Sequence, residues 1–172
     1  MYKDDRLKPF GQLLGNRLEK VENTWEAGGL YDEGWSNIIE HQIAVAALGY
    51  AITNIGSTFS RFFGLAIIEA CLIHDAFKRR EVEASKASGG DPRVLDEMAK
   101  KQKGVLLSLG WSGDIVNATA SVGHTALGRL YRKLEDVNGL DKVTHLADSL
   151  THENQFPMLE VRMESLRKLY EK

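Results

Sequence analysis

Apolar residues recur at helical spacing along almost the whole chain, and this pattern restricts the fold more than any other feature. They return every three or four positions instead of alternating, and the 172-residue sequence has only three prolines to interrupt a helix. The stretch 62–77 is apolar almost throughout, so its helix should lie at the centre of a bundle. We therefore expect an all-α fold that forms a single domain over residues 1–172.

Turn-forming residues divide this pattern into separate helices. A stripe of apolar residues after Pro9 predicts a first helix that stops at Gly28–Gly29. A loop is expected over residues 86–92, where Asp91 should cap the following helix and Pro92 should occupy its first turn. The predicted helices span about 10–28, 36–54, 61–79, 92–109, 115–127, 140–152 and 158–170.

Composition excludes several classes of partner and location. A net charge of −2 and a pI near 6.2 argue against an extended nucleic-acid groove and against an anionic membrane surface. The charged N-terminal segment lacks the apolar region of a signal peptide, and no stretch is long and apolar enough to span a bilayer. A single cysteine, Cys71, suits a reducing compartment. We expect a cytoplasmic protein with no membrane partner.

Histidine and aspartate side chains occur inside these apolar helices, where burying a charge is costly unless something compensates it. His41 lies on the same face as Ile38 and Val45, and the pair His74–Asp75 ends an apolar run. A divalent metal would compensate the charge, and imidazole with carboxylate suits Mn, Fe, Co, Ni or Zn. Taken singly, His41 is more often a core histidine, Asp75 a polar helix end and Asp148 a solvated position.

Three segments, in this order along the chain, resemble the HD superfamily of metal-dependent phosphohydrolases. They are residues 35–46 around His41, residues 72–78 with the His74–Asp75 pair in an HD-x-x-K form, and residues 143–150 around Asp148. The resemblance covers roughly residues 35–152, the expected core of the domain. It implies an HD-type bundle with a central cleft, where His41, His74, Asp75 and Asp148 hold one divalent metal ion (Mn, Fe, Co, Ni, Zn or Mg).

The resemblance also implies an activity, the hydrolysis of a phosphate ester or anhydride in a small phosphorylated substrate. Nucleotides lead among such substrates because they are common across the family. The metal would lower the pKa of its bound water and polarise a phosphoryl oxygen. Asp75 would help to orient or deprotonate this water, and Lys78 would meet a phosphate oxygen. His124 would act on the phosphate or leaving group, or would help to hold a second metal.

Other polar residues near these segments have structural interpretations. His145 and His152 are expected to support the site or to lie on the surface. Arg79 and Arg80 are expected to complement the dipole at the C-terminal end of the third helix.

Two other functions fit the same residues. Some members of the family hold two irons and oxidise their substrates with dioxygen, which would need more ligands. Alternatively, the domain is a metal-stabilised module that binds or senses a nucleotide without turnover. The apolar helices could also leave a face for a homodimer partner.

Overall fold

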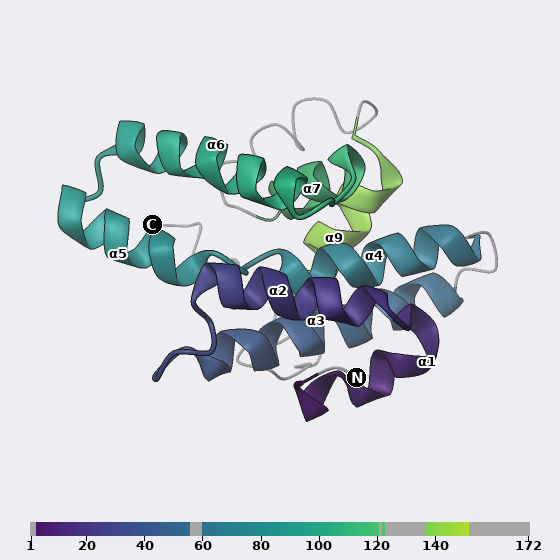
Figure 1. Cartoon of the computed structure of the whole chain (residues 1–172). Helices are drawn as coiled ribbons and strands as arrows, with labels where there is room; N and C mark the ends of the chain where they lie inside the picture. The colour runs from purple at the N-terminus through teal and green to yellow at the C-terminus, as the bar shows by residue number, and fades with distance from the viewer. Residues whose placement is uncertain (1–2, 56–59, 121, 123–136, 152–172) are drawn as a thin grey trace.

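The computed structural model describes residues 3–55, 60–120, 122 and 137–151 of the chain. Every regular element within these ranges is a helix, which confirms the predicted all-α class (Figure 1). The elements are the 3₁₀ helix η1 (Asp5–Phe10), α1 (Gly11–Leu14), α2 (Arg17–Gly28), α3 (Ser36–Ile55), α4 (Arg61–Ile73), α5 (Lys78–Ser88), α6 (Pro92–Ser108), α7 (Gly113–Ala120) and α9 (Gly139–Leu150). The helix predicted over 158–170 lies outside the described residues. Among those described, no helix combines the length and the apolar character needed to cross a membrane.

Helix α4 is the central helix, as its apolar sequence predicts. Residues 67–73 are all buried, and the helix contacts α2, α3, α7 and α9. Its approach to α3 is especially close, because a Cβ atom at Gly49 would lie 2.9 Å from Ile67 Cγ2. Burial of the shared apolar face holds the two helices together. The first half of α3 thereby lies beside the C-terminal end of α4.

The N-terminal helix is broken at Gly15, so the prediction of one continuous helix from Pro9 to Gly28 is wrong. Pro9 lies inside η1, and the short helix α1 ends before α2 begins. Gly15 has φ +51° and ψ −125°, a conformation that residues with a side chain rarely adopt. The predicted stop at Gly28–Gly29 is confirmed, because Gly29 ends α2 in the left-handed conformation with φ +78°.

The prediction of a single helix over 61–79 is also wrong at its C-terminal end. Helix α4 ends at Ile73, and a turn over residues 74–77 precedes α5. The imidazole of His74 bonds to the Cys71 carbonyl, and the indole of Trp25 donates to the Leu72 carbonyl. Side chains thus donate to carbonyls at the end of α4 that would otherwise accept from backbone N–H groups of a longer helix. The periodicity of apolar residues cannot reveal such hydrogen bonds. We refer to residues 74–77 as the HD turn.

The HD turn changes the role expected for Arg79 and Arg80. Both residues lie in the first turn of α5, so they do not complement the C-terminal dipole of a longer helix. Arg79 instead donates to the Gly29 carbonyl and pairs with Asp32 and Glu83. Arg79 therefore ties α5 to the loop that follows α2.

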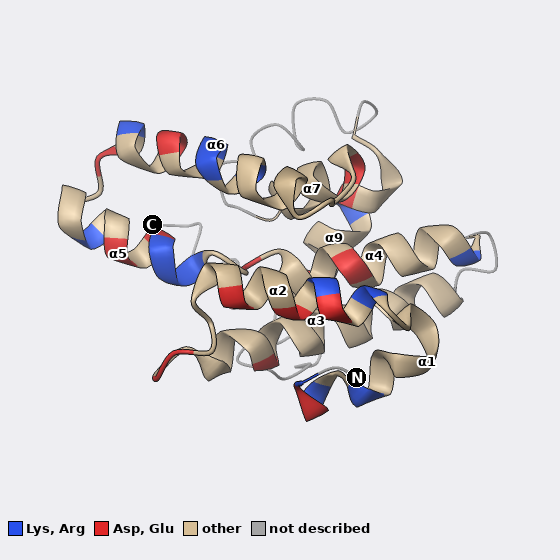
Figure 2. Cartoon of the chain, viewed as in Figure 1, with Lys and Arg blue, Asp and Glu red and all other residues tan. Residues whose placement is uncertain are grey.

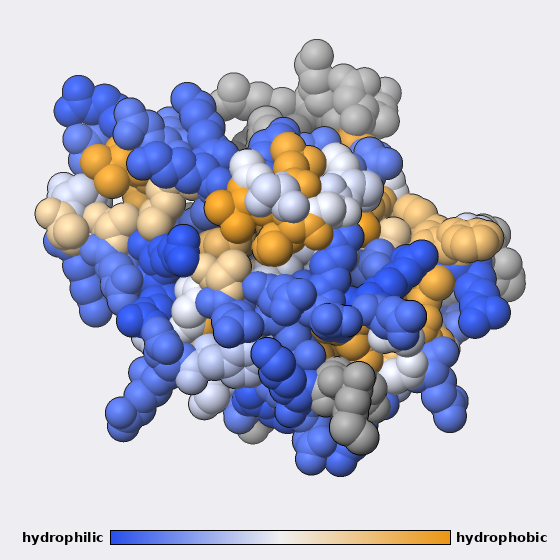
Figure 3. All heavy atoms as spheres, viewed as in Figure 1, coloured by the Kyte–Doolittle hydropathy of each residue, from blue (hydrophilic) through white to orange (hydrophobic). Residues whose placement is uncertain are grey.

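Helices α5 and α6 form a hairpin that projects from one side of the molecule (Figure 1). Helix α5 continues to Ser88, so the connecting loop is shorter than the predicted segment 86–92. The expected cap is confirmed, because the Asp91 side chain accepts from Arg93 N–H at 2.9 Å and Pro92 begins α6. Acidic and basic residues are mixed over the face drawn in Figure 2, and hydrophilic residues cover most of this face in Figure 3.

Candidate metal centre

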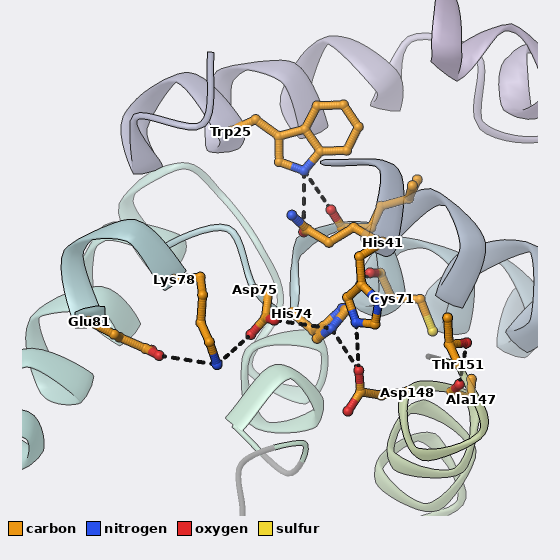
Figure 4. Close-up of polar contacts among 12 residues, drawn as sticks. Trp25, His41, Cys71, His74, Asp75, Lys78, Glu81, Ala147, Asp148 and Thr151 are labelled. Carbon is orange, nitrogen blue, oxygen red and sulfur yellow. Dashed lines mark hydrogen bonds and ion pairs between the residues drawn. The ribbon is translucent and has the colours of Figure 1, made fainter. Parts of the chain in front are cut away.

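His41, His74, Asp75 and Asp148 come together where α3, the HD turn and α9 meet (Figure 4). Asp148 Oδ1 lies 2.9 Å from His41 Nε2 and 3.2 Å from His74 Nε2. One possible ligand atom from each of His41, His74 and Asp75 lies within 4.8 Å of the other two. His41 and Asp148 are 107 positions apart in the sequence, so only the packing of α3 against α9 brings them together. We refer to these four residues as the His–Asp cluster.

The orientation of His74 suits a metal ligand. Its Nδ1 lies 2.7 Å from the Cys71 carbonyl oxygen, which can only accept a hydrogen bond. Nδ1 therefore carries a hydrogen, and Nε2 faces Asp75 and Asp148. Nε2 is buried and has no hydrogen-bond partner of correct geometry among the described residues. Histidines that bind metals are commonly fixed in this way, with the second ring nitrogen donating to a carbonyl or carboxylate.

The cluster favours positive charge. Burial raises the pKa of Asp148, but the hydrogen bond from His41 and the contact with His74 outweigh burial and hold this pKa well below its usual range. Burial lowers the pKa of His74, but the charges of Asp75 and Asp148 outweigh it and raise this pKa to about 9. In the metal-free protein, the His74 imidazole is consequently protonated at neutral pH.

The chemistry of the cluster fits a divalent transition metal. Imidazole nitrogens with carboxylate oxygens are the ligands that ions of intermediate softness prefer. The contact of His74 Nε2 with Asp148 Oδ1 at 3.2 Å lacks hydrogen-bond geometry, so a metal would give this buried nitrogen a better partner. The side chains of Asp75 and Asp148 each remain 23% exposed, so water and a small ligand can reach the cluster. A catalytic metal site needs such access, whereas a structural site is closed.

Lys78 extends the cluster toward the hairpin. Its Nζ lies 3.6 Å from Asp75 Oδ1 and 3.9 Å from Glu81 Oε2. The charge of Asp75, with a smaller contribution from Glu81, outweighs burial and raises the pKa of Lys78. The Lys78 side chain is 43% exposed and its ammonium group stays charged at neutral pH, so it can contact an anion bound beside the cluster.

The remaining predicted histidines are not part of this arrangement as described. His124 and His152 lie outside the described residues. His145 lies on α9 one turn before Asp148, and its Nε2 is 3.3 Å from Ser149 Oγ. This contact stays within α9 and leaves the role expected for His145, in support of the site or on the surface, a prediction.

Trp25 and Glu81 adjoin the cluster, and our sequence analysis did not identify either as part of the site. In the sequence, Trp25 is one residue of an apolar stripe. A tryptophan that is buried there needs a hydrogen-bond acceptor for its indole N–H, and this requirement could have indicated a role beyond packing. Glu81 lies one helical turn after Lys78, as Lys78 lies after Asp75. This regular spacing becomes informative only once α5 is known to begin at Lys78.

Comparison with known proteins gives no match to this chain. No protein-family model matches it, and neither a curated protein nor a solved structure does so.

Proposed function

We propose that this protein is an HD-type metal-dependent phosphohydrolase, which cleaves a phosphate ester or anhydride of a small metabolite. A nucleotide is the leading substrate class. The observation that carries this proposal is the convergence of His41, His74, Asp75 and Asp148 on one solvent-accessible point, with the Lys78 ammonium beside it. The lone buried cysteine suits a cytoplasmic location, which is part of the proposal.

Each residue of the cluster has a specific task in the proposed reaction. The four side chains would hold one divalent ion per chain. Such an ion, when bound, lowers the pKa of water and polarises a phosphoryl oxygen. Asp75 would orient the attacking water and accept its proton. Lys78 would bind a phosphoryl oxygen and offset the negative charge that develops there. We also assign His124 to the phosphate or leaving group.

The direct test is a phosphate-release screen with metal-stripped protein reloaded with Mn, Co, Ni, Fe or Mg. The substrates are nucleotides and small phosphoesters, and an Asp75→Ala variant is measured in parallel. Asp96→Ala is the matched control, because Asp96 is an exposed aspartate on α6. We expect phosphate release that requires the metal and Asp75 but not Asp96.

Three outcomes would overturn this proposal. One is metal binding without phosphate release from any substrate in the screen. A second is equal activity of Asp75→Ala and Asp96→Ala. The third is a content of two irons per chain with oxygen consumption, which would establish an oxygenase instead.

A further inference from the structure

Helix α2 contacts the backbone on both sides of the His74–Asp75 pair, although it carries none of the four cluster residues. Before the pair, Trp25 Nε1 donates to the Leu72 carbonyl at 2.7 Å. After the pair, Gly28 lies so close to the Ala76 carbonyl that a Cβ atom on Gly28 would be 1.7 Å from its oxygen. Helix α2 thus contacts the main chain at the end of α4 and again within the HD turn.

The Trp25 bond replaces a hydrogen bond that α4 gives up. In a continuing helix, the Ala76 N–H would donate to the Leu72 carbonyl. Here it donates to the Ile73 carbonyl at 3.1 Å, because the chain leaves the helix. The indole N–H of Trp25 satisfies the released Leu72 carbonyl within the core, where an unpaired carbonyl would be costly. This bond therefore stabilises the turn conformation that presents His74 and Asp75.

The same indole also contacts the helix that carries the other histidine. Trp25 Nε1 lies 3.3 Å from Gln42 Oε1, and Gln42 directly follows His41 in α3. Both Trp25 and Gln42 are fully buried. One indole N–H thus joins α2 to the segments carrying His41 and His74 (Figure 4).

A second tryptophan offers an internal comparison. Trp111 is 3% exposed, and its Nε1 donates to Thr24 Oγ1 at 2.9 Å. This bond joins the segment before α7 to α2 and makes no link to the HD turn. Removing the indole N–H of Trp25 leaves two buried acceptors without this donor, Leu72 O and Gln42 Oε1, whereas removing that of Trp111 leaves one, Thr24 Oγ1. Only the change at Trp25 acts on the turn that carries His74 and Asp75.

We propose that Trp25 is a positioning residue for the candidate metal centre. Its indole N–H fixes the HD turn relative to α3, and metal affinity depends on this bond. The inference rests on the proposed metal binding and assigns no new ligand. Loss of a supporting hydrogen bond typically weakens metal binding by about 10–100-fold. Because Trp25 acts through Leu72 O, we expect about tenfold, the lower end of that range.

The test compares Trp25→Phe with Trp111→Phe in the full-length protein. Co²⁺ affinity is measured by competition with a chelator, and the visible spectrum of bound Co²⁺ reports ligand geometry. Thermal unfolding of the metal-free variants measures the structural cost of each change. We expect both variants to lose stability, Trp25→Phe more than Trp111→Phe, but weaker Co²⁺ binding and an altered Co²⁺ spectrum only in Trp25→Phe. Equal affinities and identical spectra would overturn the inference.

A measurement on the unaltered protein keeps the test decisive if Trp25→Phe does not fold. The chain has three tryptophans, whose indole N–H signals can be followed by NMR during titration with Zn²⁺. We expect the Trp25 signal to move and its hydrogen exchange to slow, while the Trp111 signal stays unchanged. An unchanged Trp25 signal in a protein that binds Zn²⁺ would overturn this inference alone. A protein that binds neither ion would overturn the proposed function as well.

Discussion

Residues 67–73 of α4 are all buried, whereas α5 has no buried residue and α6 has only Leu106. The core formed by α2, α3 and α4 carries His41 in α3 and supports the HD turn. The α5–α6 hairpin carries Lys78 and Glu81 and contributes only Leu106 to the buried residues of the core. Under the proposed function, the core would set the geometry of the candidate metal site and the hairpin would contact an anionic substrate. Substitutions in the two regions should therefore change different measurements.

The largest expected effect concerns the cluster itself. Asp148→Asn keeps the shape of the side chain but removes the charge that contacts both histidines. We expect metal affinity to fall by at least about 100-fold, more than for loss of a supporting residue. Isothermal titration calorimetry with Mn²⁺ or Co²⁺ measures this change. Asp96→Asn, an exposed change on α6, should bind as the wild type does. Equal affinities for the two variants would show that the cluster is not the metal site.

The second prediction compares the stability of the core with that of the hairpin. Ile68 is fully buried on α4, and Ile68→Ala should reduce the free energy of unfolding by about 3 kcal/mol through lost burial and a cavity. Val94 on α6 is 39% exposed, and Val94→Ala should cost less than about 0.5 kcal/mol. Urea unfolding followed by circular dichroism measures both. A comparable loss for Val94→Ala would contradict the difference between the two regions.

Lys78 tests whether the hairpin contributes to substrate binding without setting metal affinity. A hydrogen bond from a charged group contributes about 1.5–3 kcal/mol, so Lys78→Met should raise KM about tenfold or more. Metal affinity should not fall, because Lys78 supplies no ligand and its removal only relieves the ion pair with Asp75. Lys86→Met, an exposed change in the last turn of α5, should alter neither quantity. A loss of metal binding in Lys78→Met would show that Lys78 contributes to metal affinity as well as to substrate binding, and would contradict the prediction.

The last prediction concerns a pH dependence of the metal-free protein. The pKa of His74 is raised from 6.5 to about 9 in the folded chain, so its protonated form stabilises the fold. This contribution is complete below pH 6.5 and is lost as the pH rises through about 9. We expect the unfolding temperature of the metal-free protein to fall by about 10 °C over this interval. Metal binding requires neutral His74, so the metal-loaded protein should not show this fall. An identical pH dependence with and without metal would contradict the prediction.

The sequence was a good guide wherever a local signal determined the structure. Apolar spacing predicted the all-α class and the central position of α4. Gly29 and Asp91 occupy the helix ends at which their chemistry places them. The resemblance to the HD superfamily also selected four residues, His41, His74, Asp75 and Asp148, that the fold brings together.

The predictions that were wrong or incomplete have one of two physical causes. The feature that was missed depends either on a contact between residues distant in the sequence or on a particular backbone conformation. The end of α4 is stabilised by the indole of Trp25, which is 47 positions away from Leu72 in the sequence. Glu81 adjoins the site only because the HD turn starts α5 at Lys78. The helix breaks at Gly15 because this residue adopts an unusual backbone conformation, which the spacing of the apolar residues does not predict. Periodicity along one helix cannot report such contacts.

The central claim is that one divalent metal ion binds between α3, the HD turn and α9. Its most direct test is a crystal structure of the cobalt-loaded protein, with anomalous difference maps recorded at the cobalt absorption edge. We predict one anomalous peak per chain, within ligand distance of His41 Nε2 and His74 Nε2 and of carboxylate oxygens of Asp75 and Asp148. A peak at another position, or no peak in crystals grown with saturating Co²⁺, would contradict the account.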